Sequence, residues 1–345
     1  MTKTTISMPM LNTPLGELPE MAKRAEDAGF DGVWSYEFWR NPYIGLGGPA
    51  LSTAKITLGT AIGTAFSRTP WDIANQAADV DELSGGRHIL GLGTGAPEFL
   101  GTFHGIDYPA KPLSQFKEFV EGVRASWRYL STGDVTAFDG EFYKIRPPPV
   151  NPWGRRSLAR ADIPIYMAGM QPRAIQAAGE LADGLIGVLY TPSFITDVAL
   201  PNLEAGARRA GRDPAGVDLV GYTICSCSTD RAEAKRRARI QVGMYVGGST
   251  LVDRVVAAHG LVDDQLAIRQ ALMTDGPDAL ERVTSDRLVE TFSISGTPDE
   301  CRKQIEPYRA ALANRTVLLH TPYVPPLSRE ESADAFWSIT EAFGS

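Results

Sequence analysis

The sequence alternates short apolar segments with amphipathic segments, and we count this unit eight times along the chain. Each apolar segment has the length of a buried strand, and each following segment carries apolar residues at the spacing of one helical face. Nearly continuous apolar strands that alternate with helices are typical of a parallel sheet covered by helices. Eight such units favour a closed (β/α)8 barrel, or TIM barrel, with an open doubly wound sheet as the alternative.

The expected strands cover residues 4–10, 31–38, 55–63, 89–93, 163–170, 183–190, 218–229 and 316–323. Two longer segments interrupt the alternation. Residues 138–162 are typical of a small hairpin followed by a stiff, proline-rich loop, and residues 231–282 predict additional helices. We therefore expect a single domain over residues 1–345, with insertions after the fourth and seventh strands.

Composition limits the partners of this chain. With 345 residues and 43% hydrophobic content, the chain can bury one large core. A net charge of -7 argues against nucleic acid and against an anionic membrane surface as partners, so we expect a small-molecule ligand. No apolar run reaches the length of a membrane span, and the first residues lack the apolar run of a signal peptide. We expect a cytoplasmic protein, and a homodimer is left open.

Glycines are concentrated where the fourth expected strand ends. Gly91, Gly93 and Gly95 alternate with Leu92 and Thr94, which places bare backbone in a polar loop. The backbone N-H groups of such a turn, with the Thr94 hydroxyl, can cradle a phosphate. The spacing differs from that of dinucleotide-binding folds, so the residues alone leave a tight turn as an equal alternative.

The active site of a (β/α)8 barrel lies at the carboxyl ends of its strands, which selects the candidate site residues. In this chain those positions hold Tyr36, Glu37, Thr60, Ala61, Ile62, Thr94, Gly95, Met167, Gly169, Leu189, Tyr190, Cys227 and His320.

Several motifs resemble those of the bacterial luciferase-like family. The chain carries L-G-T-x at residues 58–61, S-x-G-R at 84–87, G-x-G-T-G at 91–95 and G-x-x-P at 169–172. Residues 25–34, 138–147 and 292–305 extend the similarity, which is closest to the branch that uses the deazaflavin coenzyme F420. That branch includes sugar-phosphate dehydrogenases, secondary alcohol dehydrogenases and methylenetetrahydromethanopterin reductases.

The resemblance implies an oxidoreductase that transfers a hydride between F420 and a small, apolar organic substrate. Two alternatives stay open. One is an FMN-dependent monooxygenase of the same superfamily, and the other is a barrel that binds a flavin or deazaflavin without catalysis.

The resemblance also implies which residues contact the coenzyme. Ala61 and Ile62 are expected to flank a non-prolyl cis peptide that supports the ring system. The other expected coenzyme contacts, taken by position from the family or from the strand ends, are Tyr36, Thr60, Thr94, Gly95, Ala96, Ala168, Gly169 and Met170. With the family in view, the phosphate cradle at residues 93–96 becomes the favoured interpretation.

Three positions depart from the sugar-phosphate dehydrogenases of this branch. Those relatives end the second strand in Ser-Asp-His, where this chain has Ser35, Tyr36 and Glu37. Ala96 stands where they carry a glutamate, and Thr191 stands where they carry a phosphate-binding lysine. A sugar phosphate is therefore not the expected substrate.

Hydride transfer to or from a carbon requires a proton to move at a neighbouring atom. Glu37 is the first candidate, because it occupies the position of the base in the dehydrogenase relatives and because burial beside Tyr36 and Trp39 can raise its pKa. His320, at the end of the last expected strand, is the second candidate.

Aromatic residues in the expected strand-end loops predict an apolar substrate pocket. Trp39, Phe99 and Tyr190 are the main candidates, and Tyr43, Phe66 and Phe103 could join them. Glu98 and His104 are weaker candidates for substrate contact. Cys225 and Cys227 have a spacing that suggests metal ligands, but no second pair of ligands accompanies them, so core packing is favoured and no metal is expected.

Overall fold

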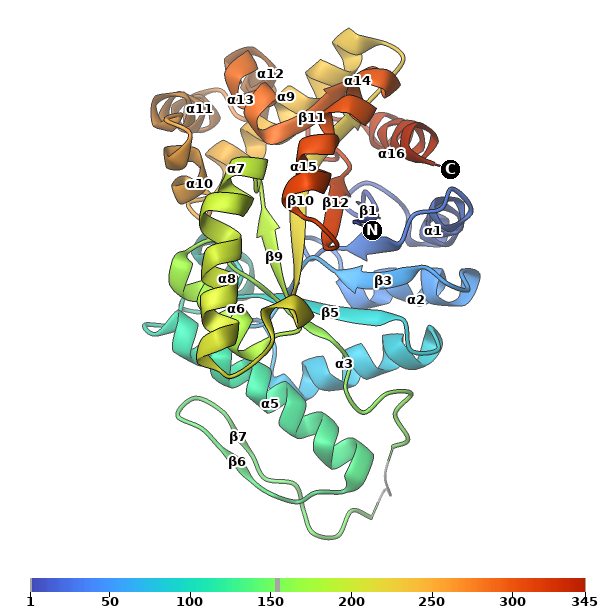
Figure 1. Cartoon of the computed structure of the whole chain (residues 1–345), viewed down its shortest axis with the longest axis vertical. Coiled ribbons are helices and arrows are strands. Elements are labelled where there is room, and N and C mark those ends of the chain that lie inside the picture. Colours follow the sequence, from blue (N-terminus) through green and yellow to red (C-terminus); the bar gives the residue numbers. More distant parts are fainter. Residues whose placement is uncertain (1, 153–155, 345) are drawn as a thin grey trace.

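A computed structural model describes residues 2–152 and 156–344 and shows a closed barrel of parallel strands surrounded by helices (Figure 1). Within the described residues the barrel strands are β1 (Lys3–Ser7), β2 (Gly32–Ser35), β3 (Thr57–Thr60), β5 (His88–Gly93), β8 (Ile165–Ala168), β9 (Gly184–Val188), β10 (Asp218–Cys227) and β12 (Thr316–His320). The barrel closes because β12 pairs with both β1 and β10. The predicted (β/α)8 fold is confirmed, and the open-sheet alternative is wrong.

Two short strands, β4 and β11, were not predicted, whereas the small hairpin expected in residues 138–162 is present. β4 (Gly63–Thr64) resumes the pairing with β5 after β3 has ended. β11 (Ser293–Gly296) pairs with Ile224 to Cys227, the carboxyl-terminal part of β10. The hairpin of β6 (Phe138–Asp139) and β7 (Lys144–Ile145) lies in the predicted insertion. The third expected strand is therefore interrupted, which matters for the site.

The helices that cover the barrel are α1 (Leu18–Asp27), α2 (Pro42–Ser52), α3 (Pro70–Leu83), α5 (Pro112–Thr132), α6 (Pro172–Leu181), α8 (Leu200–Arg209), α14 (Pro298–Gln304), α15 (Glu306–Ala311) and α16 (Arg329–Phe343). On α5 the predicted stripe from Phe116 to Leu130 is buried. Thr297 and Glu300 form the predicted capping box at the start of α14.

The insertions appear where they were expected, and Figure 1 shows them at opposite ends of the molecule. After β5 come α4 (Pro97–Phe99) and η2 (Leu100–His104), and the β6–β7 hairpin follows α5. After β10 come α9 (Arg231–Gly247), α10 (Asp253–Ala258), α11 (Val262–Thr274), α12 (Leu280–Val283) and α13 (Asp286–Phe292). None of the described helices is both long enough and apolar enough to cross a membrane.

The barrel encloses its own small core, which we call the interior cluster. It consists of Trp34, Tyr166, Ile186, Val220, Tyr222 and Leu318, all buried. The partly buried residues that pack against it include Ala61, Ile62, Val188 and Tyr245. Ala61 and Ile62 follow β3 and Val188 ends β9, so these residues cover the interior cluster at the carboxyl end of the barrel.

Candidate functional site

The carboxyl ends of β3, β5 and β8 meet at the mouth of the barrel, as the motifs predicted. A Cβ atom added to Gly93 would lie 3.0 Å from the Ile62 side chain and 3.3 Å from the Ala168 Cβ. Gly95 has a φ of 77°, and a Cβ there would come within 2.8 Å of Thr64 Cγ2. A side chain at Gly93 would therefore crowd both neighbouring strand ends, and the positive φ of Gly95 favours glycine there.

The peptide bond between Ala61 and Ile62 is cis, as the resemblance implied. It lies in the gap between β3 and β4, where the backbone ladder with β5 is interrupted. The Thr60 hydroxyl fills this gap, because it donates to the Gly91 carbonyl oxygen at 2.7 Å and accepts from the Gly91 N-H at 2.9 Å. Thr60 is fully buried in the barrel wall, and its contact with the coenzyme stays a prediction.

Glu37 joins the end of β2 to the segment that follows the cis peptide. Its N-H donates to the Ile62 carbonyl oxygen at 3.0 Å. Its carboxylate accepts from the Thr64 N-H at 2.7 Å and pairs through both oxygens with the Arg68 guanidinium, at 2.7 and 2.8 Å. Arg68 was missed in the sequence, where it is one arginine just before α3. The role of Glu37 as a base stays a prediction, and its contacts show a carboxylate that is already engaged.

His320 is fully buried at the end of β12. Its Nδ1 lies 2.7 Å from the Ser7 hydroxyl, and its Nε2 lies 3.0 Å from the Tyr245 hydroxyl and 3.3 Å from Gln241 Nε2. Burial lowers the pKa of His320 to about 3, so the ring is neutral at physiological pH. The imidazole has no exposed surface, and a catalytic role of His320 stays a prediction.

Four tyrosines surround His320 at the barrel mouth. Tyr36 stacks on Tyr323 with 4.6 Å between ring centroids and presents its edge to His320 at 5.7 Å. Burial raises the pKa values of Tyr36, Tyr222 and Tyr323 well above the ordinary range. Tyr36 is 6% exposed and packs against His320, and its contact with the coenzyme stays a prediction.

The loop after β5 keeps partly exposed backbone at Thr94, Gly95 and Ala96. The Thr94 hydroxyl accepts from Tyr108 at 3.1 Å and donates to the Gly95 carbonyl oxygen at 3.2 Å, so it stabilises its own loop. Across the mouth, Ala168 and Met170 are partly exposed and Gly169 is buried. Their contact with a coenzyme stays a prediction.

Exposed aromatic rings from two strand-end loops form one cluster, which we call the mouth aromatics. Phe38 and Trp39 follow β2, whereas Phe99 and Phe103 lie in α4 and η2. Centroid distances are 4.6 Å for Phe38 to Trp39, 5.5 Å for Phe38 to Phe99 and 4.8 Å for Trp39 to Phe103. Trp39 is 59% exposed and Phe103 is 54% exposed. The structure thus brings Trp39 and Phe99 together and adds Phe38, which sequence reasoning missed.

The other predicted pocket aromatics are core residues. Tyr190 is fully buried, packs against Phe194 and donates its hydroxyl hydrogen to the Gly169 carbonyl oxygen. Tyr43 and Phe66 are also buried. Tyr190 thus packs in the core, and its contact with the substrate stays a prediction. Glu98 and His104 are exposed beside the mouth aromatics, with the His104 ring 5.2 Å from Phe99.

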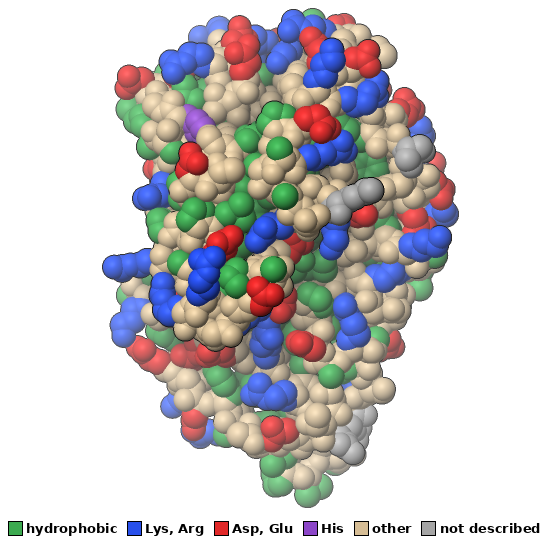
Figure 2. Space-filling model, viewed as in Figure 1, with side chains coloured by type: hydrophobic (Ala, Val, Ile, Leu, Met, Phe, Trp, Pro, Cys, Tyr) green, Lys and Arg blue, Asp and Glu red, His purple; other side chains and the backbone are tan. Residues whose placement is uncertain are grey.

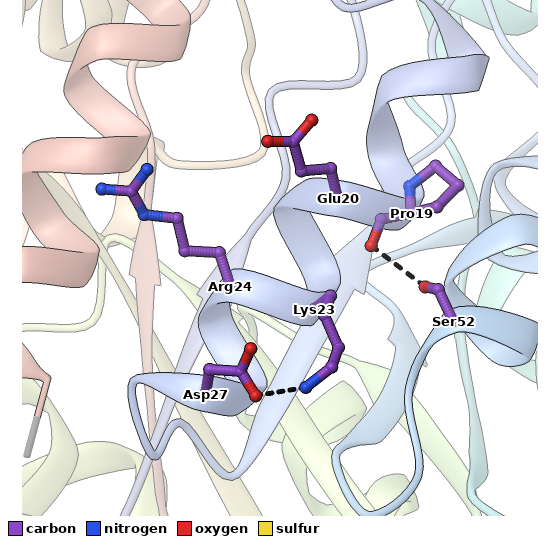
Figure 3. Close-up of a pocket in the computed structure, with 6 residues that line it drawn as sticks. All are labelled: Pro19, Glu20, Lys23, Arg24, Asp27 and Ser52. Atoms are coloured by element: carbon purple, nitrogen blue, oxygen red, sulfur yellow. Dashed lines mark hydrogen bonds and ion pairs between the residues drawn. The ribbon is translucent and has the colours of Figure 1, made fainter.

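Among the described residues, Figures 2 and 3 show charged groups and a hollow on the surface outside the strand ends. Figure 2 shows acidic and basic side chains interspersed across the face that it displays. A surface hollow between α1 and α2 is drawn in Figure 3, where Lys23 pairs with Asp27 and the Ser52 hydroxyl donates to the Pro19 carbonyl oxygen. This hollow lies on helices outside the barrel, away from the strand ends.

The buried histidines give a testable pH dependence of stability. His88 is also fully buried, and burial lowers its pKa to about 4. Below pH 6.5 the two histidines bind protons in the unfolded chain but stay neutral in the folded chain. Their contribution to the free energy of unfolding is therefore fully present above this pH, and it is lost as the pH decreases toward their pKa values in the folded state. We expect each histidine to lower the free energy of unfolding by about 2 kcal/mol between pH 7.5 and pH 5.

Urea unfolding at several pH values measures this loss. Replacing His320 by asparagine should flatten the dependence, whereas replacing the exposed His104 by glutamine should leave it unchanged. A free energy of unfolding that is constant between pH 7 and pH 5 would contradict the prediction.

Comparison with known proteins gives one family and several similar enzymes. A model of the luciferase-like monooxygenase family matches residues 1–315. The 5,10-methylenetetrahydromethanopterin reductase of Archaeoglobus fulgidus is 35% identical over 298 residues, which cover 84% of this chain and 85% of that protein. The enzyme of the same name from Methanolobus tindarius is 33% identical over 297 residues, covering 85% and 86%.

A solved structure agrees with these relatives. The coenzyme F420 dependent tetrahydromethanopterin reductase from Methanopyrus kandleri superposes with a TM-score of 0.83 at 26% identity. The superposition covers 99% of each chain, including both insertions described above.

Proposed function

Because the chain belongs to the luciferase-like monooxygenase family, we propose that it is an oxidoreductase that binds coenzyme F420 at the mouth of its barrel. The coenzyme would exchange a hydride with an organic substrate there. The proposal is supported by relatives that are named methylenetetrahydromethanopterin reductases and by the F420-dependent reductase with the same fold.

The observation that carries the proposal is the surface formed where β3, β5 and β8 end. Its partly exposed residues are Ala61, Ile62, Thr94, Gly95, Ala96, Ala168 and Met170. None of these side chains is charged, and Gly93 lies between Ile62 and Ala168 with no side chain of its own. Small and apolar groups of this kind fit the flat, apolar face of a deazaflavin ring, and the glycine backbone of the β5 loop can approach a phosphate.

The bound coenzyme would supply two-electron hydride chemistry that reacts poorly with oxygen. The residues of this chain would orient the ring and exclude water. We further propose that the mouth aromatics bind the apolar part of the substrate, since Trp39 and Phe103 present large exposed rings beside the same strand ends. The mouth aromatics are apolar, so we do not expect them to bind a sugar phosphate.

Equilibrium titration tests the choice of coenzyme. We expect F420 to bind the coenzyme-free protein more tightly than FMN does, measured by the change in coenzyme fluorescence. Gly93→Ala should weaken F420 binding at least tenfold, because the new methyl group lies in the gap between Ile62 and Ala168. Gly101→Ala is the matched control, because a Cβ at Gly101 meets no other atom within 4 Å.

Turnover is then assayed by the oxidation of reduced F420. The probes are cyclohexanone, 2-cyclohexen-1-one and 5,10-methylenetetrahydromethanopterin. Tight FMN binding without F420 binding would overturn the proposal in favour of a flavin monooxygenase. F420 binding without oxidation by any probe would contradict hydride transfer to these substrate classes and favour a binding protein.

A further inference from the structure

Tyr245 occupies a special place among the tyrosines at the barrel mouth. It lies on α9, in the insertion after β10, and packs on the interior cluster together with Ala61 and Ile62. Tyr245 is partly exposed, whereas Tyr222, Tyr323 and His320 are buried. Tyr245 is therefore the member of this hydrogen-bonded group with exposed surface, and it packs on the same interior cluster as Ala61 and Ile62 of the proposed coenzyme site.

The Tyr245 hydroxyl is the centre of the group. Its oxygen lies 2.8 Å from the Tyr222 hydroxyl, 3.2 Å from the Tyr323 hydroxyl and 3.0 Å from His320 Nε2. A phenol has one hydrogen to donate and two lone pairs. When Tyr222 and His320 donate to the two lone pairs, the hydrogen of Tyr245 is left for Tyr323, the most distant partner at 3.2 Å, or for a substrate. If Tyr245 gives its proton away, the same three groups can all donate to the oxygen that remains. Such donors stabilise a phenolate in a site shielded from water.

The hydrogen bonds of Ser7 favour one tautomer of His320. The Ser7 hydroxyl oxygen accepts from the Thr321 N-H at 3.1 Å, which leaves its own hydrogen for His320 Nδ1 at 2.7 Å. The hydrogen of the neutral ring is then on Nε2, facing Tyr245. The Gln241 amide nitrogen is a further donor near Nε2, but its distance of 3.3 Å makes it the weakest of these contacts.

We propose that Tyr245 is the catalytic residue that gives the substrate its proton, and that His320 is a positioning residue that acts through Tyr245. This inference rests on the proposed function. In the reduction of a carbonyl, the carbon accepts a hydride with its two electrons from the reduced coenzyme, and the C=O π bond breaks. The oxygen then bonds to the proton of Tyr245, whose O-H bond breaks to leave a phenolate. A proton from water restores Tyr245, and oxidation of an alcohol follows the reverse path.

The two residues expected from the sequence are less suited to this step. Glu37 pairs with Arg68 through both carboxylate oxygens and also accepts from the Thr64 N-H. Giving or taking a proton there would break the ion pair. His320 has no exposed atom and reaches the mouth only through the Tyr245 hydroxyl.

The variant Tyr245→Phe keeps the ring and removes a single hydroxyl group. We expect the single-turnover oxidation of reduced F420 by cyclohexanone to slow by about 10²- to 10³-fold, within the usual effect of a positioned acid. F420 affinity should stay within about threefold of the wild-type value, because the ring still packs on the interior cluster. Tyr308→Phe is the matched control, because it removes a buried hydroxyl that contacts Thr223. Tyr308 belongs to the larger hydrophobic core, which is separate from the interior cluster.

A measurement on the protein without substrate tests the same inference independently of turnover. In protein labelled with [ζ-¹³C]tyrosine, the Tyr245 signal is the one that Tyr245→Phe removes. We expect this signal to shift when F420 binds and also to shift in His320→Asn, while the Tyr308 signal stays in place. His320→Asn should also change the pH profile of the turnover rate, which a purely structural role would leave unchanged.

Two kinds of failure are distinguishable. The role of Tyr245 alone would be overturned if the Tyr245→Phe enzyme binds F420 and turns over at nearly the wild-type rate. It would also be overturned if the Tyr245 signal shifts neither when F420 binds nor in His320→Asn. Wild-type protein that neither binds F420 nor oxidises its reduced form would overturn the proposed function, and this inference with it.

Discussion

Replacing Arg68 by methionine is expected to destabilise the protein by about 3 to 5 kcal/mol, because it leaves the Glu37 carboxylate buried without its cation. The Glu37 side chain is 5% exposed and that of Arg68 is 15% exposed, so water cannot replace the lost partner. The Thr64 N-H alone would then remain on the carboxylate. Urea unfolding of the purified variant measures the change.

A double variant separates a structural role of Glu37 from a catalytic one. Glu37→Gln combined with Arg68→Met removes both charges, and we expect it to recover most of the stability that Arg68→Met loses. If Glu37 holds the segment from Ile62 to Arg68 in place, the double variant should also recover turnover. If Glu37 is the base, turnover should stay about 10²- to 10⁴-fold low.

The control for this pair is an ion pair at the surface. Lys111 and Glu141 lie 2.8 Å apart, with side chains 62% and 60% exposed. Lys111→Met should change the free energy of unfolding by less than about 1 kcal/mol. An equally small effect of Arg68→Met would show that the Glu37 carboxylate reaches water in solution, contrary to the structure.

Replacing Gly91 by valine is expected to abolish the folded state. A Cβ atom at Gly91 would lie 1.8 Å from the carbonyl oxygen of Thr60 and 2.7 Å from Ile186 Cδ1. The first of these neighbours is backbone in the barrel wall and cannot move aside, so the cost should exceed the usual 1 to 3 kcal/mol of overpacking. The same substitution would separate Thr60 from the Gly91 groups that its hydroxyl bridges.

Circular dichroism and the yield of soluble protein measure this effect. Gly216→Ala serves as the control, because a Cβ at Gly216 meets no other atom within 4 Å, and we expect a change within about 0.5 kcal/mol. Gly91→Val protein that melts cooperatively near the wild-type temperature would contradict the prediction.

The fold and part of the site could be predicted because both depend on patterns that run along the chain. Alternating apolar strands and helical stripes record which residues are buried, and they suffice for a parallel barrel with two insertions. The strands of such a barrel end on one side. Residues after β3, β5 and β8 were therefore placed together at the mouth before any contact was known, as Ile62, Gly93 and Ala168 show.

Individual side chains were harder to predict, because a position at a strand end does not say where its side chain points. Tyr190 lies two residues after the end of β9, but a Cβ at Gly187 would lie 2.0 Å from the Tyr190 ring, so the ring occupies the space beside that glycine and is fully buried. Thr60 ends β3 with its hydroxyl turned into the barrel wall. In both cases close packing between neighbouring strands decided the orientation.

The sequence by itself determined the barrel, its insertions, the family motifs and the set of strand ends that form the mouth. The tertiary structure alone decided the partners of the polar groups there, namely Arg68 for Glu37 and Tyr245 for His320. Tyr245 lies 75 residues before His320 in the chain, on a helix of an insertion whose periodicity carries no information about its position over the barrel. A buried polar group needs a partner, but the chain must close into the barrel before it determines which distant residue is that partner.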